Sequence, residues 1–323
     1  MTPGETEGRC LCCGKSLAGL PEIAQWHASC VRKFFGSPVI PEIDATAETL
    51  EKFARSAVAS GMTVTGVQKK MSLRLEEKSG SKRLTLVGYP SGYIFKPPVA
   101  EYPDLPTLEH ALMSLAEKAG IETVPHALVR TVSGQTGYIT RRIDRISSAK
   151  GNTVRKRAME DFCQLSLRLT EDKYKGSCEQ CAKIIKAHSH RTGLDLADFF
   201  YLVLFNFASG NADMHLKNYS LIESDAGFRL SPAYDLVPTK LLIPEDAEES
   251  ALAINGKKNK LSANDFLRFA HSIGLPEKAA RNLIAKIRSL PSLLEKTDNI
   301  GFLPDHRRES LRQLVESRCK ILE

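Results

Sequence analysis

Hydrophobic and polar residues alternate over short runs in the first third of the chain. The runs MSLRL, LTLVG and YIFK each have a period of two and are separated by Gly, Ser and Pro. Alternation of this kind is typical of β-strands that bury one face, and the short breaks favour hairpin turns. The pattern from Lys52 to Lys96 therefore predicts a mostly antiparallel sheet.

The pattern changes to helical spacing farther along the chain. In LPTLEHALMSLAEKAG, the residues Leu108, Leu112 and Leu115 recur on one stripe, and Gly120 is a suitable C-terminal stop. A short strand is predicted in GYITRRIDR. Further helices are predicted in AMEDFCQLSLRL, CEQCAKIIKAHSH, LADFFYLVLFNFAS, LSANDFLRFAHSIG and RESLRQLVESRCKILE. Ser262 is a suitable N-cap for the fourth of these helices.

These patterns divide the chain into three parts. Residues 1–41 form a small Cys/His module that ends in a linker, because the prolines of SPVIPEID discourage regular structure. Residues 42–145 form a β-rich N-lobe, and residues 146–323 form a helical C-lobe. We therefore expect an α+β, bilobal fold whose order of lobes is that of protein kinases, with the module added in front.

Composition and charge exclude few function classes. The 323 residues are 42 % hydrophobic, which allows a substantial core, and no apolar run is long enough to span a bilayer. The N-terminus has no basic start followed by an apolar segment, so we expect a cytoplasmic protein with reduced cysteines. The net charge of +7 is scattered along the chain and is compatible with nucleic acid, phosphate-bearing ligands or an acidic partner.

Three polar residues of the second half have the spacing that phosphoryl transfer needs. Asp213 in GNADMHLKN is followed five positions later by Asn218, and Asp235 follows in SPAYDL. A kinase needs a carboxylate that accepts the proton of the attacking hydroxyl, together with an amide and a second carboxylate that hold Mg²⁺. These residues suit those three roles in that order. A polar loop with Asx turns is the alternative, because Asp and Asn are common turn residues.

Two segments of the β-rich part could contact phosphate. In GMTVTGVQKK, the residues Gly61 and Gly66 permit close backbone approach, and Gln68, Lys69 and Lys70 could meet phosphate oxygens. Lys96 ends the strand YIFK, as the ATP-contacting lysine of kinases does. A hairpin turn with exposed lysines is the alternative for the first segment.

Several motifs together resemble the HipA family of serine/threonine kinase toxins. They are TVTGVQKK, YIFKPP, LPTLEHALMSLAEKAGI, RRIDR, EDFCQL, GNADMHLKNYSL, LSPAYDLVPT and INGKKNKLSANDF. The resemblance implies a bilobal kinase-like fold, ATP and Mg²⁺ as cofactors, and a place in a bacterial toxin–antitoxin system. GNADMHLKN and PAYDL are its most specific parts.

The same resemblance assigns roles to individual residues. It implies that Asp213 is the catalytic base and that Asn218 and Asp235 bind Mg²⁺. Glu109 could pair with Lys96, and the alternative is that it is a solvated helix residue. The segment Arg141, Arg142 and Ile143 matches the hinge beside the adenine, although the family often has an acidic and an aromatic residue at its outer positions. The remaining residues implied to bind the nucleotide are Thr65, Gly66, Val67, Gln68, Lys69, Lys70, Lys96, His215, Leu216, Lys217 and Tyr234.

Full-length family members have an additional N-terminal subdomain, and too few residues precede Gly61 here to form it. In this respect the chain resembles the compact HipT branch. That branch implies two partners, a small antitoxin that resembles the missing subdomain and a DNA-binding antitoxin. It also implies an aminoacyl-tRNA synthetase as the phosphorylated protein and autophosphorylation of the phosphate loop at Thr63 or Thr65. We expect no membrane association and no direct binding of nucleic acid.

The N-terminal module has the residues of a metal site. Cys10 and Cys13 form a CxxC pair, and His27 and Cys30 form an HxxC pair, which together suit tetrahedral Zn²⁺. The alternative is a set of reduced cysteines in a small apolar module with an aromatic core. The second CxxC pair, in CEQCAKII, has no partner pair nearby and suits a packed helix face.

Two other function classes are compatible with parts of the sequence. A small-molecule kinase of the aminoglycoside-phosphotransferase type would use the same Asp, Asn and Asp residues. A zinc-ribbon protein that binds nucleic acid would explain the N-terminal cysteines and the charge, but it leaves GNADMHLKN unexplained. Only the HipA-like motifs separate the protein kinase from the small-molecule kinase.

Overall fold

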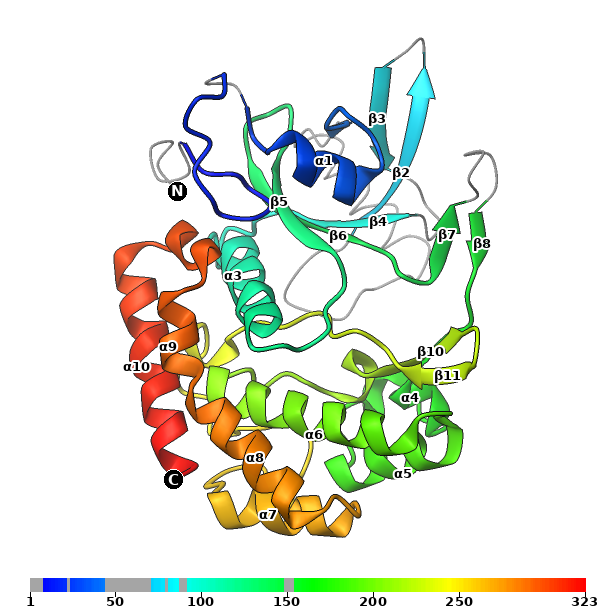
Figure 1. Ribbon diagram of the computed structural model, residues 1–323, viewed down its shortest axis with the longest axis vertical. Helices are drawn as coiled ribbons and strands as arrows, with labels where there is room; N and C mark the ends of the chain where they lie inside the picture. Colours follow the sequence, from blue (N-terminus) through cyan, green and yellow to red (C-terminus); the bar gives the residue numbers. More distant parts are fainter. Residues whose placement is uncertain (1–7, 22–23, 44–70, 79–80, 87–91, 148–153) are drawn as a thin grey trace. The chain divides into compact units, whose positions relative to one another are not determined.

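A computed structural model describes residues 8–21, 24–43, 71–78, 81–86, 92–147 and 154–323 (Figure 1). The chain divides into two compact units. Unit 1 contains Met1–Ala111, Val124–Arg145 and Asp298–Pro304, and unit 2 contains Leu112–Thr123, Ile146–Thr297 and Asp305–Glu323. Among the described residues, no helix combines the length and the apolar character that a membrane span requires.

Unit 1 is built on a six-stranded sheet in the order β1-β3-β2-β4-β6-β5. All neighbouring strands are antiparallel except β1 and β3, so the predicted antiparallel sheet is confirmed. β1 lies in the stretch predicted to be an irregular linker, where Ile43 is buried and pairs with Leu84. The strands are β1 (Glu42–Ile43), β2 (Met71–Lys78), β3 (Ser81–Leu86), β4 (Tyr93–Lys96), β5 (His126–Arg130) and β6 (Thr136–Arg141).

The core of unit 1 joins the Cys/His module to this sheet. Helix α1 (Ala28–Phe35) buries Phe34 and Phe35, whose rings pack against Trp26 and Tyr93. The same cluster of buried side chains contains residues of β2 to β6 and Phe302 of the turn η5 (Asp298–Phe302). The aromatic residues of the module therefore share one core with the strands.

Helix α3 (Leu105–Lys118) is the predicted amphipathic helix. Its residues up to Ala111 belong to unit 1, and those from Leu112 belong to unit 2. Leu108, Leu112 and Leu115 are buried, as their spacing predicts. Gly120 follows with φ +85°, a left-handed conformation that glycine adopts without steric cost, so the predicted stop is confirmed.

Unit 2 is mainly helical and is centred on α6 (Thr192–Ser209), which contacts α5, α8 and α10 (Figure 1). Its other helices are α4 (Phe162–Leu165), α5 (Cys178–His188), α7 (Ala263–Ser272), α8 (Glu277–Arg288), α9 (Leu290–Glu295) and α10 (Asp305–Ile321). Short turns of 3-10 helix are η2 (Thr170–Asp172), η3 (Leu216–Asn218) and η4 (Thr239–Leu241).

Two small sheets complete the described structure. One has the order β11-β10-β9, with β9 (Met159–Asp161), β10 (Ser220–Ser224) and β11 (Gly227–Leu230) all antiparallel. The other pairs β7 (Arg145–Ser147) with β8 (Val154–Lys156). The three-stranded sheet is important for the site, because β10 begins two residues after Asn218 and β11 ends shortly before Asp235.

The helix predicted across AMEDFCQLSLRL is wrong for most of its length. Its first part forms β9, and only α4 is helical. Asp161 starts this helix with a capping box, in which its carboxylate accepts a hydrogen bond from the Gln164 amide at 2.8 Å. The helix ends within one turn, and Leu167 shortly after it has φ +55° and is exposed. Pairing of β9 with β10 therefore overrides the local helical spacing.

The predicted N-cap at Ser262 is confirmed, and it belongs to a larger network. The Asp265 carboxylate accepts hydrogen bonds from the Ser262 amide and hydroxyl, and from the side chains of Asn255 and Lys257. Burial alone would raise the pKa of Asp265, but these donors outweigh it and hold the pKa well below its usual range. The motif INGKKNKLSANDF is thus explained by the start of α7.

A second buried carboxylate fixes the start of α6. Asp195 is completely buried and accepts hydrogen bonds from the Ser189 hydroxyl at 2.6 Å, the Leu230 amide at 2.6 Å and the Arg191 guanidinium at 2.7 Å. These bonds connect α6 to the end of α5 and to β11. The neighbouring Asp198 makes only a 3.3 Å ion pair with Arg191 at the surface.

We predict that Asp195→Ala lowers the free energy of unfolding by about 2–4 kcal/mol, because the buried Leu230 amide would lose its acceptor. Asp198→Ala is the matched control and should cost less than about 1 kcal/mol, because its ion pair is exposed. Urea unfolding followed by circular dichroism measures both values. Equal losses for the two variants would contradict the role given to Asp195.

Candidate active site

The predicted catalytic segment directly follows α6 and is anchored before it reaches Asp213. Gly210 ends the helix with φ +71°, and a Cβ atom there would lie 2.5 Å from Leu314. The Asn211 side chain donates a hydrogen bond to the Asn206 side chain at 3.0 Å, and the Ala212 amide donates to Thr239 Oγ1 at 2.9 Å. The Asn211 backbone amide also donates to the Asn206 carbonyl at 2.9 Å, so the segment before Asp213 is tied to α6 and η4 of unit 2.

Asn218 is connected to the residue that was predicted to be the base. Its side-chain Nδ2 donates a hydrogen bond to the backbone carbonyl of Asp213 at 3.0 Å. The bond closes the loop over the five-residue spacing and turns the amide so that Oδ1 is the side-chain acceptor. An amide oxygen is a ligand that Mg²⁺ accepts.

The Asp213 carboxylate also has a partner that the sequence did not predict. The Tyr174 hydroxyl donates a hydrogen bond to Asp213 Oδ1 at 2.7 Å, and its ring packs edge-on against His215. Burial, followed by this bond to a carboxylate, raises the pKa of Tyr174 well above its usual value. Tyr174 lies in the loop between η2 and α5, where KYKGS carries no recognisable signal.

Tyr234 and Asp235 follow β11 in the sequence, and Tyr234 connects back to the catalytic segment. Its hydroxyl donates to the Lys217 carbonyl at 3.0 Å and lies 2.6 Å from the Ser220 hydroxyl. Asp235 adopts φ +56°, a left-handed conformation that is uncommon for a residue other than glycine.

The other predicted residues of the segment 215–217 have mainly structural contacts. Lys217 forms an ion pair with Asp161 at 2.8 Å, and Leu216 is buried, with its amide donating to the Lys173 carbonyl. His215 is 6 % exposed, and its Nδ1 has no hydrogen-bond partner among the described residues. Burial lowers the pKa of His215 to about 4, against the opposing effect of the nearby Asp213 carboxylate.

In unit 1, Lys96 and Glu109 form the predicted ion pair. Lys96 Nζ of β4 lies 2.5 Å from Glu109 Oε1 of α3, and both side chains are buried. The ammonium group also lies over the Tyr138 ring, 5.1 Å from its centre. The lysine is therefore held in one position by a carboxylate and an aromatic face.

The predicted hinge, Arg141 to Ile143, is tied into unit 1 by its backbone. The Arg141 amide donates to the Pro125 carbonyl at 3.0 Å, and the Arg142 amide donates to the Gly92 carbonyl at 2.9 Å. The Arg142 guanidinium forms a two-bond fork with the buried Asp144 at 3.0 and 2.7 Å, and Arg145 contacts the same carboxylate. The motif RRIDR thus has a structural explanation, and an adenine-binding role of its residues stays a prediction.

The predicted phosphate loop, with Thr63, Thr65, Gly66, Val67, Gln68, Lys69 and Lys70, lies outside the described residues. The four predicted metal ligands of the N-terminal module are brought together. Cys178 and Cys181 are buried on α5, in keeping with the packed helix face expected for them.

Comparison with known proteins gives consistent matches. The model of the HipA-like C-terminal domain family matches residues 62–293. "Putative kinase Y4mE" of Sinorhizobium fredii is 29 % identical over 81 % of this chain and 63 % of its own length. "Serine/threonine-protein kinase toxin HipA" of Shewanella oneidensis is 34 % identical over 30 % of this chain and 23 % of its own.

A solved structure of Shewanella oneidensis HipA, in complex with HipB and operator DNA, matches with a TM-score of 0.66. The identity is 24 %, and the match covers 80 % of this chain and 64 % of that one. The similarity confirms the predicted α+β, kinase-like fold. This chain thus spans just under two thirds of the length of the HipA structure and of the first Sinorhizobium relative.

We predict that His215 makes folding stability depend on pH. An unfolded histidine has a pKa near 6.5, whereas the folded value is about 4. Between these values the unfolded chain binds a proton that the folded chain excludes, so stability falls as the pH falls and levels off below pH 4. The loss is on the order of 3 kcal/mol.

Urea unfolding at several pH values, for the wild type and His215→Gln, isolates this effect from that of other titrating groups. The difference in stability between the two proteins should change between pH 6.5 and 4. A difference that stays constant over this range would show that His215 does not exclude the proton.

Proposed function

This chain belongs to the HipA-like C-terminal domain family, and from that premise we propose that it is an ATP- and Mg²⁺-dependent serine/threonine protein kinase. The observation that carries the proposal is the 3.0 Å hydrogen bond between the Asn218 side chain and the Asp213 carbonyl. It closes one short loop that carries both a carboxylate and an amide oxygen, two groups that phosphoryl transfer to a hydroxyl uses.

The proposed roles follow from the contacts of each residue. Asp213 would accept the proton of the attacking hydroxyl, and its carboxylate already accepts a hydrogen bond from one hydroxyl, that of Tyr174. Asn218 Oδ1 and the Asp235 carboxylate would hold Mg²⁺, which supplies positive charge against the phosphate oxygens. Lys96, held by Glu109, would contact the phosphates of ATP.

The biological setting is proposed from the relatives. The HipA structure contains HipB and operator DNA, which supports a DNA-binding antitoxin as partner of this chain. We further propose a small antitoxin that resembles the N-terminal subdomain of longer family members, and an aminoacyl-tRNA synthetase as the phosphorylated protein. A cytoplasmic location and a compact HipT-like type of toxin belong to the same proposal.

We predict that Asp213→Asn lowers the rate of phosphoryl transfer at least about 100-fold, because an amide cannot accept the proton. Asp235→Asn should lower the rate and also weaken ATP binding in the presence of Mg²⁺. Asp225→Asn is the matched control, because Asp225 lies exposed in the turn between β10 and β11. It should retain wild-type activity.

The measurement uses labelled ATP with two sets of acceptors, aminoacyl-tRNA synthetases and aminoglycosides. Label on a synthetase supports the proposal. Label on an aminoglycoside alone would replace it with the small-molecule kinase. Turnover by folded Asp213→Asn at the wild-type rate would remove the assignment of the base.

We also predict autophosphorylation of Thr63 or Thr65. A phosphate there adds about −1.5 to −2 charges where ATP phosphates would approach, so nucleotide binding should weaken. Mass spectrometry after incubation with Mg²⁺ and ATP should find the modification in the wild type and not in Asp213→Asn. Unmodified threonines after long incubation would exclude this regulation and leave the kinase proposal intact.

A further inference from the structure

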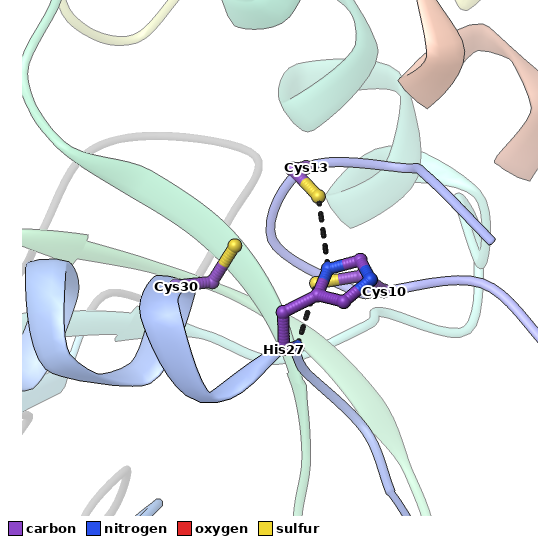
Figure 2. Close-up of side chains that lie close together, drawn as sticks. All are labelled: Cys10, Cys13, His27 and Cys30. Carbon is purple, nitrogen blue, oxygen red and sulfur yellow. Dashed lines mark hydrogen bonds between the residues drawn. The ribbon is translucent and has the colours of Figure 1, made fainter. Parts of the chain in front are cut away.

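Four side chains of the N-terminal module meet at the start of α1 (Figure 2). Cys10 and Cys13 come from a turn, and His27 and Cys30 come from the N-cap and the first turn of the helix. Their ligand atoms all lie within 4.8 Å of one another. The ligand atoms of a tetrahedral Zn²⁺ site lie about 3.5–3.8 Å apart, so each needs to move by less than about 1 Å to bind the metal.

The histidine is oriented as a metal ligand. Its Nε2 lies 3.0 Å from the carbonyl of Ser16, which can only accept a hydrogen bond, so the proton is on Nε2. The lone pair is therefore on Nδ1, which points at Cys13 Sγ at 3.4 Å (Figure 2). A hydrogen bond from the second ring nitrogen to a carbonyl is the usual support of a zinc-bound histidine.

The turn that carries the two cysteines is also built for close packing. The Gly14 amide donates to the Cys10 carbonyl at 2.8 Å, and Gly14 has φ +75°. A Cβ atom at Gly14 would lie 2.7 Å from the backbone nitrogen of Asn299, so another residue would not fit. The His27 amide donates to Cys10 Sγ at 3.4 Å, a contact that stabilises a thiolate.

The apolar core of the module does not account for this cluster. The core lies with Trp26, Phe34 and Phe35, which pack on one another and on Tyr93. Cys13, His27 and Cys30 are only half-buried. Reduced cysteines that serve only as small apolar side chains would have no reason to converge on an imidazole nitrogen at the edge of the core.

We propose that Cys10, Cys13, His27 and Cys30 bind one structural Zn²⁺. Three soft thiolates and one imidazole favour zinc over Mg²⁺ or Ca²⁺, which prefer oxygen ligands. All four tetrahedral positions are taken by protein side chains, so the site has no open position for a substrate. Its role is therefore to hold the module together.

The neighbours of the ligands define what the metal holds in place. The Leu11 carbonyl accepts a hydrogen bond from the Leu128 amide at 2.8 Å, and Trp26 Nε1 donates to the Leu128 carbonyl at 3.1 Å. Gln25 Oε1 accepts from the Arg130 amide at 3.1 Å. β5 is an edge strand of the six-stranded sheet, so the zinc-bound segment covers an edge that would otherwise expose backbone groups.

The first test is metal analysis of the full chain, purified without a chelator. We expect about one zinc per chain in the wild type. Cys13→Ser should lower zinc affinity at least about tenfold, because a serine hydroxyl replaces a thiolate. Cys12→Ser is the matched control, since Cys12 is adjacent in sequence but is not one of the four converging side chains, and it should keep its zinc.

The wild-type measurement decides the question even if Cys13→Ser does not fold. Protein that contains no zinc and takes up none from added ZnCl₂ would overturn the proposal. Iron in place of zinc would overturn the identity of the metal. Zinc lost from Cys12→Ser to the same degree as from Cys13→Ser would overturn the ligand set.

The second test is hydrogen exchange of the wild type before and after zinc is removed with a chelator. The Leu128 amide should exchange faster without zinc, because its acceptor Leu11 is next to Cys10. Amides in the middle of α6, in unit 2, should be unchanged. Equal protection of Leu128 in both states would contradict the role of the metal at the β5 edge.

Neither test depends on kinase activity. Failure of the zinc proposal can therefore be distinguished from failure of the proposed function.

Discussion

Burying a carboxylate requires nearby donors or cations that offset the loss of water, and much of this structure is arranged to meet that requirement. Glu109 meets Lys96, Asp144 meets two arginines, Asp195 meets an amide, a hydroxyl and a guanidinium, and Asp265 caps a helix. An unpaired buried charge would cost several kcal/mol, which is a large part of the stability of a domain. These contacts therefore fix the elements from which the candidate site is built.

This requirement changes how the family motifs are interpreted. RRIDR and INGKKNKLSANDF contributed to the resemblance, but Asp144 pairs with two arginines, and Asp265 pairs with Lys257 and accepts a hydrogen bond from the Ser262 backbone amide. GNADMHLKN is different, because the Asp213 carboxylate accepts a hydrogen bond from the neutral hydroxyl of Tyr174. A motif can thus mark a family through its scaffold as well as through its chemistry.

The sequence predicted features that depend on local spacing. The strands β2, β3, β4 and β6, the helices α3, α5, α6 and α7, and the five-residue link between Asp213 and Asn218 follow from period or offset. It did not predict β9 or Tyr174, because both depend on contacts with residues far away in the chain. The pairing of Lys96 with Glu109 was expected only from a resemblance. Periodicity does not show which distant side chains meet, so it could not supply that pair.

The contact of Asn299 with the cysteine turn has a consequence for synthesis of the chain. The Asn299 side chain donates to the Cys12 carbonyl across 287 positions, and Phe302 is in the same core as Cys10. A ribosome must therefore make about nine tenths of the protein before unit 1 can close. Until then its first hundred residues present unpaired apolar surface, a state that chaperones recognise and that favours aggregation.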